Sequence, residues 1–446
     1  MFNRNETVMR SMITFLVLFC FVLVGAEGSC ADELLATASP TETVPAPTGN
    51  NDEYHTPLAG EPYHTVFMGQ PVYVPAQDRG HVTALTLGAT YYTPSQGDTS
   101  GSPIFALYIK RVWEESLTRD IISIFVNDLE YDRTLWKNLE LVSRFENNTL
   151  PGGQAEVLNN QIINSSSQEL GTIMASIGPG LRFKVAPFEI DNDLRIQLLA
   201  RTGYFYAHRT SETDPNVVLP PDTMLYGAKL RGRYDGMRRN ILELPHEGIA
   251  AGFDLDYTYR DKWADFGGPP SNVVFTKSNT QDYTQFTGYV MAVGGIPGLS
   301  EKNRILLSYH GGTTDKSSVD RYNAFRISGG PLPGESDDLA RVDYPGTMFS
   351  LIPVANYNMV AVEYRRELTF FMYLHLRGTF LQADRASIIG ANQVGFASSY
   401  GKNVLIGLDT GFLWNSELYL AYSWDSGFIR NGTSGSGLIL TWNKNL

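Results

Sequence analysis

Cysteine is nearly absent from this sequence, because its 446 residues include only Cys20 and Cys30. Residues 12–25 form an apolar run of about 14 residues that follows basic residues, which is typical of a secretory signal peptide. The small residues on either side of Cys30 supply a small-x-small cleavage pattern. We therefore predict a signal peptide over residues 1–31 and a mature chain that begins near Asp32.

The mature chain then has no cysteine, so no disulfide bond stabilises it. A closed β-barrel offers another source of stability to an exported chain of this size, because its backbone hydrogen bonds are all satisfied between strands. An alternative interpretation makes Cys30 the lipid-modified residue of a lipoprotein. Glu27 argues against it, since such sites carry an aliphatic residue at that position.

Several other features are missing. After the leader, no stretch approaches the roughly 18 consecutive apolar residues of a membrane-spanning helix. The nucleophile elbow, the zinc-protease helix motif and the phosphate-binding loop are also absent. Ser308 and His310 share one strand face but lie about 7 Å apart along it, too far for a direct hydrogen bond. We expect no enzyme activity, no cofactor and no metal site, and the net charge of -12 argues against a nucleic-acid partner.

Residues 32–80 differ in composition from the rest of the chain. Prolines recur among threonine, alanine, glycine and acidic residues, at Pro40, Pro45, Pro47, Pro57, Pro62, Pro71 and Pro75. Such a composition is typical of an extended or disordered segment. We interpret residues 32–80 as a Pro-rich periplasmic linker.

From His81 onward, apolar and polar residues alternate with a period of two, which predicts β-strands. Residues 253–259 show the alternation most cleanly, and residues 358–380 form two such runs with a short turn between them. The prediction includes a single strand at 121–131 and a short strand at 324–328, and it treats the polar segment 147–168 as a loop. It gives about 16 strands, within a range of 12 to 16.

The apolar strand faces need a partner. In a soluble sandwich they would meet a second sheet, whereas in an outer-membrane barrel they meet lipid and the charged faces line the lumen. Aromatic residues at strand ends, such as Tyr91 and Trp442, fit the interfacial girdles of a barrel. The sequence predicts an all-β chain whose residues 81–446 form a transmembrane antiparallel β-barrel in the bacterial outer membrane. To place every long loop on one side, one strand must be miscounted before Gly329.

The predicted lumenal faces are rich in basic residues. They comprise Arg182, Lys184, Arg195, Arg201, Lys229, Arg231, Arg233, Arg326, Arg365 and Arg377. One interpretation is a structural network in which these residues pair with acids, for which Asp254, Asp256, Glu363 and Asp409 are candidates. The alternative is a passage that prefers anions.

The stretch from Asp320 to Asp384 resembles the BamA/TamA-type barrel family, also called bacterial surface antigens. The resemblance rests on residues 325–331, which include Gly329 and Gly330 and look like the strand before the family's long sixth loop. It also rests on residues 362–365, which look like the strand that follows. The resemblance implies that this loop enters the lumen with Arg341 and Tyr344. It further implies that Glu363 and Asp384 are the wall partners of Arg341.

The chain departs from the family pattern in two ways that matter for function. The loop motif of an aliphatic residue followed by Arg-Gly-aromatic is missing, and residues 339–344 occupy its place. Residues 32–80 are also too few and too proline-rich for a periplasmic repeat domain. Likeness of fold survives such differences better than likeness of function.

Three functions follow as expectations. The first is insertion or transport at the outer membrane, using the seam between the strands near Thr83 and Leu438. The second is a passive porin-like channel with a basic lumen, and the third is a structural surface barrel. The expected partners are outer-membrane lipid and a periplasmic chaperone or repeat-domain protein.

Overall fold

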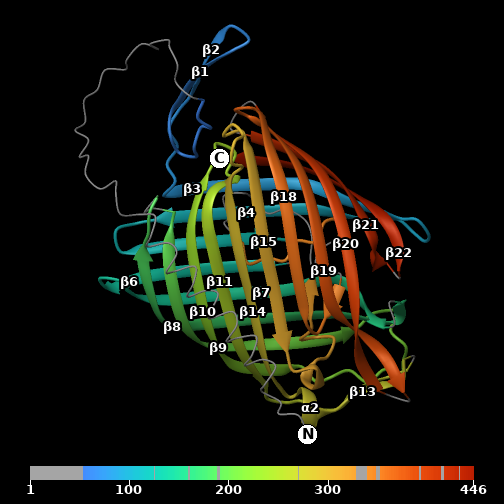
Figure 1. Cartoon of the computed structure of the whole chain (residues 1–446). Coiled ribbons are helices and arrows are strands. Elements are labelled where there is room, and N and C mark those ends of the chain that lie inside the picture. The colour runs from blue at the N-terminus through green and yellow to red at the C-terminus, as the bar shows by residue number, and fades with distance from the viewer. Residues whose placement is uncertain are drawn as a thin grey trace.

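The computed structural model describes residues 54–124, 126–158, 161–187, 191–269, 271–327, 339–347, 352–390, 393–412, 416–430 and 432–446. Its main feature is a closed barrel of sixteen antiparallel strands (Figure 1). The barrel strands are β3 (His81–Pro94), β4 (Ser100–Val112), β5 (Ser116–Ser123), β6 (Val126–Trp136), β7 (Leu139–Leu158), β8 (Gln161–Lys184), β9 (Asp193–Arg209), β10 (Thr223–Arg239), β11 (Pro245–Arg260), β14 (Asp282–Gly295), β15 (Asn303–Thr314), β18 (Tyr357–Thr369), β19 (Met372–Gly390), β20 (Gln393–Phe412), β21 (Ser416–Arg430) and β22 (Thr433–Asn445). The predicted fold class is confirmed.

Neighbouring barrel strands are also neighbours in sequence, except at one place. There β22 pairs with β3, from Gly435 opposite Pro94 to Asn445 opposite Ala84, and this seam closes the barrel. The barrel's first and last residues therefore lie at the same end, which also carries the turns that follow β4, β6, β8, β10, β14, β18 and β20. We call it the short-turn end, and we call the opposite end, which carries the connections 210–222, 261–281 and 315–356, the long-loop end.

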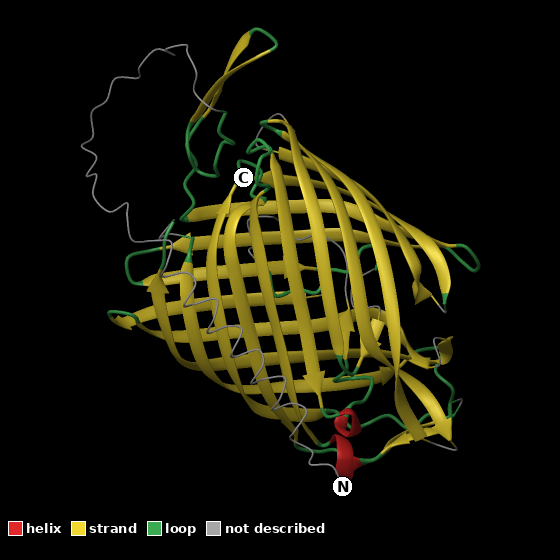
Figure 2. Cartoon of the chain, in the orientation of Figure 1, coloured by secondary structure: helices red, strands yellow, loops and turns green. Residues whose placement is uncertain are grey.

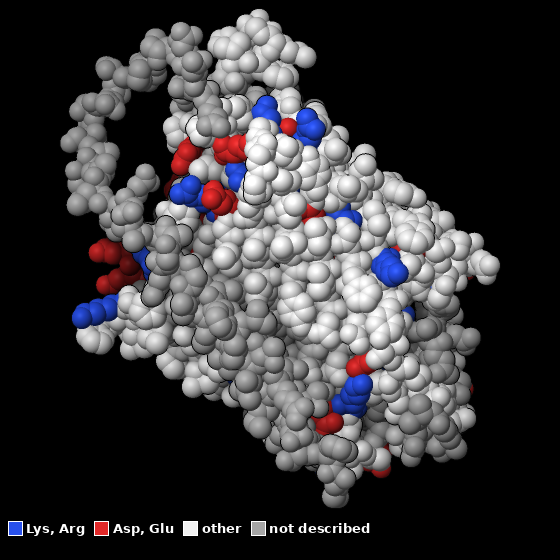
Figure 3. Space-filling model, viewed as in Figure 1, with Lys and Arg blue, Asp and Glu red and all other residues white. Residues whose placement is uncertain are grey.

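Side chains alternate between the outside and the lumen as predicted. On β18, Val360 and Val362 are each 46% exposed on the outside, whereas Met359 and Ala361 are buried inside. Figure 3 shows the outer face largely without charge across its middle, with charged residues gathered toward the two ends. An apolar outer band around a polar interior is the arrangement that a lipid bilayer requires.

Two strand assignments made from the sequence were wrong, and their errors cancel in the total. The segment 121–131 contains the end of β5 and the start of β6, which pair across a tight turn. The segment 324–328 contains β16 (Phe325–Ile327), which pairs with β17 (Ile352–Val354) outside the barrel sheet. Counting two barrel strands within 121–131 and none at 324–328 places the long connections at one end.

The prediction that residues 147–168 form a loop was also wrong. They belong to β7 and β8, whose hairpin is much longer than its neighbours and projects at the long-loop end (Figure 2). A strand that extends beyond the bilayer does not need an apolar face. The alternation that identifies membrane strands is therefore lost there.

Smaller elements decorate the two ends. At the long-loop end are the ribbon of β12 (Phe266–Gly268) and β13 (Val273–Phe275), the helix α2 (Lys277–Thr280) and the 3-10 turn Lys316–Ser318. At the short-turn end, β1 (Tyr63–Phe67) and β2 (Gln70–Val74) form a hairpin. In the described residues, no helix has the length and apolar character needed to span a bilayer. The predicted signal peptide and residues 32–53 lie outside the described residues.

Candidate functional site in the barrel lumen

The long connection between β15 and β18 enters the lumen. His310 Nε2 on β15 donates a hydrogen bond to the carbonyl oxygen of Leu339 at 2.9 Å. Arg377 on β19 forms an ion pair with Asp343 at 2.9 Å and also donates to its carbonyl oxygen. The loop residues 339–347 are thus attached to β15 and β19 on one part of the inner wall.

A second set of contacts attaches the same loop to β20 and β21. The Tyr344 hydroxyl donates to Asp425 Oδ1 on β21 at 2.7 Å, and the Asn403 amide on β20 donates to the carbonyl oxygen of Pro345 at 2.9 Å. Tyr344 is fully buried, and its ring lies 5.5 Å from that of Phe428. These bonds satisfy polar groups that would otherwise be buried without partners.

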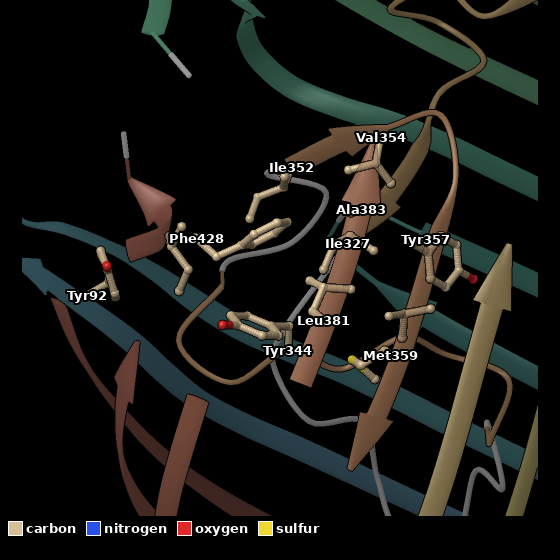
Figure 4. Packing of buried hydrophobic residues seen from close by; sticks show 12 residues of the cluster. Tyr92, Ile327, Tyr344, Ile352, Val354, Tyr357, Met359, Leu381, Ala383 and Phe428 are labelled. Atoms are coloured by element: carbon tan, nitrogen blue, oxygen red, sulfur yellow. The ribbon is translucent and has the colours of Figure 1, made fainter. Parts of the chain in front are cut away.

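Apolar packing holds the loop at the long-loop end of the lumen. Figure 4 shows Tyr344, Ile327 and Ile352 gathered against Met359 and Leu381 of the wall strands β18 and β19. The inner wall is apolar here because it faces protein rather than water. Burial of such side chains contributes about 1.5–3 kcal/mol each, so the loop is a packed part of the barrel.

The structure places the predicted loop residues as follows. Tyr344 lies in the lumen, Arg341 is half-buried on the same loop segment, and Gly329 and Gly330 lie outside the described residues. The described ion pair between this loop and the wall joins Asp343 to Arg377, so the loop supplies the acid and the wall the base. Sequence reasoning missed Asp343 in this role.

The two acids expected to face Arg341 are engaged with other groups. Glu363 forms an ion pair with Arg365 at 2.8 Å and a hydrogen bond with His375 Nδ1 at 2.9 Å. Asp384 pairs with Lys316 at 2.8 Å and accepts hydrogen bonds from Asn356 and Ser398. Asp425 was also missed, although its position in the alternation of β21 points inward and could have revealed it.

Six of the ten predicted lumenal basic residues belong to one connected set of ion pairs on β5–β11, which we call the charge lattice. Eight basic and eight acidic side chains form it: Arg119, Arg144, Arg182, Arg195, Arg201, Lys229, Arg231 and Arg233 with Asp128, Glu130, Asp132, Glu140, Glu146, Asp193, Asp254 and Asp256. Lys184 is exposed at the short-turn end, and Arg326 lies on β16, outside the barrel sheet.

Glu130 lies at the centre of the charge lattice. Its carboxylate is within 2.8 Å of Arg119, 2.9 Å of Arg231 and 3.2 Å of Arg195. Because acids and bases are equal in number, the lattice neutralises the basic face. A cavity of about 80 Å³ separates the lattice from Leu339 and Ala340 at the end of the loop, which is room for a few water molecules.

The seam between β3 and β22 is built differently. Its inward side chains are small or uncharged, among them Thr86 and Thr90 on β3 and Ile439 and Thr441 on β22. A Cβ added at Gly88 would lie 2.2 Å from the carbonyl oxygen of Leu440, so only glycine permits this close approach of the two backbones. The seam is thus held by its backbone ladder and by close packing.

Residues 54–80, which we call the strap, lie across the short-turn end. Leu58 forms an antiparallel bridge with Asn240 in the turn after β10, and the backbone of Ala59 donates to Arg239 at 3.0 Å. In the order of the sixteen strands, β10 and β11 lie opposite the seam. The strap therefore runs from the far wall back to the start of β3, and its sequence gave no sign of these contacts.

An ion cluster fixes the returning part of the strap. Arg79 contacts both Asp191 and Glu243, and Lys110 lies 2.6 Å from Asp191. Burial favours a higher pKa for Asp191, but the charges of Lys110 and Arg79 outweigh it and leave this pKa below its ordinary value. Within the described part of the chain, no group of His, Cys, Asp or Glu side chains is placed to hold a metal ion.

Comparisons with known proteins define the class. No family model and no curated protein matches the sequence significantly. Among solved structures, BamA from Haemophilus ducreyi lacking POTRA domains 1–3 matches 86% of this chain and 75% of its own, with TM-score 0.50 and 11% identity. CdiB from Acinetobacter baumannii matches 87% of this chain and 66% of its own, with TM-score 0.46 and 11% identity.

The closed sixteen-stranded barrel with its apolar outer band, and its fold likeness to BamA, define a β-barrel of the outer-membrane type. The likeness to BamA also confirms, at the level of fold, the resemblance inferred from residues 320–384. The fold of the barrel is therefore similar to that of BamA, and identity this low shows nothing beyond the fold.

Proposed function

We propose that this barrel inserts or transports polypeptides at the outer membrane by opening at the β3–β22 seam. The observation that carries the proposal is the asymmetry of the wall. Sixteen charged side chains connect β5–β11, whereas the inward residues of the seam are small or uncharged. Separating β3 from β22 therefore breaks backbone bonds and packing but leaves the charge lattice intact. No chain segment joins β3 directly to β22 at either end, so these two strands can part along their whole length.

The lumen supports the same proposal over a passive channel. Most of the basic residues expected to attract anions are paired with acids, and residues 339–347 pack against the inner wall. Both features oppose free diffusion through the lumen. A route through the seam does not need an open lumen. In an outer membrane, the short-turn end with its strap faces the periplasm.

A disulfide lock tests the proposal. Thr90 and Ile439 are paired across the seam and both are buried, so Thr90→Cys with Ile439→Cys should lock it. Ala361 and Thr379 are paired inward residues of β18 and β19, and Ala361→Cys with Thr379→Cys is the matched control. The assay is insertion of a urea-unfolded small outer-membrane barrel into liposomes that contain each variant.

We expect the seam lock to abolish assisted insertion until a reductant is added, and we expect the control to retain it. Insertion that proceeds equally well with the seam locked would refute the proposed route. Insertion no faster than in protein-free liposomes would refute the proposed function itself.

A further inference from the structure

A cavity of about 470 Å³ lies at the short-turn end, between the β1–β2 hairpin and the barrel. Its apolar lining comes from Val72 and Val74 of β2, Phe67 of β1, and Ile241, Leu242 and Phe371 of two barrel turns. Polar residues of the barrel rim, among them Glu243, Glu417 and Asn443, also line the cavity. Pockets of this size and mixed lining are typical of ligand sites.

The hairpin above the cavity has open edges. In the described residues, β1 pairs only with β2, so each strand leaves one row of backbone donors and acceptors without a strand partner. Residues 63–77 contain no Asp, Glu, Lys or Arg. Natural edge strands are usually protected by charge, by proline or by a covering element. Pro71 within β2 removes one backbone donor, but β2 carries no charge, so its remaining backbone groups can still pair with another strand.

The two strands of the hairpin are placed differently. Tyr63 and Phe67 of β1 pack against the turn after β18, with ring centres 5.5 Å from Phe370 and 5.2 Å from Phe371 respectively. On β2, Val72 and Val74 point into the cavity. The edge of β2 therefore lies beside the cavity, while β1 anchors the hairpin to the barrel.

From this arrangement we infer that β2 and the cavity bind an extended polypeptide segment whose apolar residues alternate with polar ones. The segment adds a third strand to the hairpin through its backbone, and every second side chain enters the cavity. This inference rests on the proposed function and deepens it, since an unfolded membrane strand has this alternation. The hairpin then receives such a strand at the periplasmic mouth before it reaches the seam.

One feature of the site favours a polypeptide over a lipid chain. An acyl chain has no groups for the backbone donors and acceptors of an open strand edge, whereas a peptide backbone matches them.

Peptide binding to the full mature chain in detergent micelles tests the inference. The probe is a fluorescent nine-residue peptide with Val or Phe at alternate positions and Thr or Lys between them. One control peptide has the same composition with its apolar residues clustered. A second control carries N-methyl groups on alternate amides, which remove backbone donors while the side chains stay. Anisotropy reports the dissociation constant of each.

Two substitutions locate the site. Val72→Asp places a charge in the cavity, and Tyr73→Asp places the same charge on the opposite face of β2, where Tyr73 is exposed. We expect Val72→Asp to weaken binding of the alternating peptide at least tenfold and Tyr73→Asp to change it less than twofold. Heat-modifiable migration of both variants on gels checks that the barrel is folded. Both control peptides should bind at least tenfold more weakly than the probe.

A variant without the hairpin adds an independent check. The backbone N–H of Gln77 donates to the carbonyl oxygen of Gly60 at 3.2 Å, so the two ends of the hairpin segment lie close together. A short Gly-Ser bridge can therefore replace residues 62–75 without moving the rest of the strap. Loss of peptide binding in this variant supports the inference. Equal binding by Val72→Asp and Tyr73→Asp, or by both backbone forms of the peptide, would overturn it. So would a site occupied by detergent or by a second copy of the chain, shown by detergent competition or a hairpin-dependent dimer.

The insertion assay keeps the two proposals separate. Assisted insertion without peptide binding would remove only the hairpin site. Peptide binding without assisted insertion would remove the proposed function and leave a periplasmic peptide site.

Discussion

Replacing Glu130 by glutamine tests whether the charge lattice stabilises the barrel. Glu130 is 6% exposed and its carboxylate contacts three cations within 3.2 Å. Glutamine has nearly the same shape, so Glu130→Gln removes a charge and leaves no cavity. Three guanidinium groups then lose a shared acid in a largely enclosed lumen.

The magnitude follows from what each cation keeps. Breaking a buried ion pair by removing one partner typically costs about 3–5 kcal/mol. Here each cation retains a second acid. Those distances are 3.1 Å from Arg119 to Asp132, 2.8 Å from Arg195 to Asp193 and 3.6 Å from Arg231 to Asp254. We therefore expect a loss of about 3 kcal/mol in the free energy of unfolding, at the lower end of that range.

Urea unfolding of the barrel in detergent micelles, followed by tryptophan fluorescence, measures this loss. The matched control is Glu169→Gln, because Glu169 is exposed on the projecting part of β8. An exposed substitution of this kind should change stability by less than about 0.5 kcal/mol. The denaturant slope should stay constant, since the exposed area does not change. A loss below about 1 kcal/mol for Glu130→Gln would show that the lattice does not stabilise the barrel.

Three further predictions follow from the structure. Leu198 on β9 and Leu299 in the turn after β14 are both 56% exposed, but only Leu198 lies on the lipid-facing side of a strand. Leu198→Arg should therefore destabilise the barrel by about 2–4 kcal/mol in urea unfolding in bilayers, and Leu299→Arg should not. Equal effects of the two variants would contradict the assignment of the lipid-facing side. The pKa of Asp191 is lowered, so the contribution of this carboxylate to strap stability is complete above about pH 4 and is lost on further acidification. Pepsin should therefore cut the strap more readily below this pH. A cleavage rate that does not change with acidity would contradict the ion cluster. Trypsin added to whole cells should not cut at Arg341 if the loop lies in the lumen, and ready cleavage would refute that placement.

The fold could be predicted largely because lipid imposes a strict pattern. A residue such as Val360 must be apolar and its neighbour Met359 must face inward, so period two identifies each strand inside the bilayer. The pattern fails where that requirement ends. The outer part of the β7–β8 hairpin lies beyond the bilayer, and its polar sequence read as a loop. At 121–131, the tight turn between β5 and β6 interrupts the alternation too briefly to be seen.

The lumenal site was harder to predict because it depends on contacts between distant segments. Glu363 was expected to face Arg341 of the loop, and the sequence did not show that Arg365, two residues away on the same strand face, forms an ion pair with it. The strap was interpreted as part of a linker because proline and small residues give it no periodic face. Its order comes from Asn240, Glu243 and other rim groups, whose proximity the sequence does not show.

The loop and the seam are physically connected at the long-loop end. Tyr344 of the loop binds Asp425 of β21, and Tyr92 of β3 donates to the same carboxylate at 3.4 Å. The backbone of Gly346 lies close to Gly437 of β22, since a Cβ added at Gly437 would be 2.8 Å from the Cα of Gly346. The loop therefore contacts both sides of the closed seam and the strand beside it. On the proposed function, β3 cannot leave β22 at this end without losing contacts to the loop, so release of the loop and opening of the seam are one coupled step.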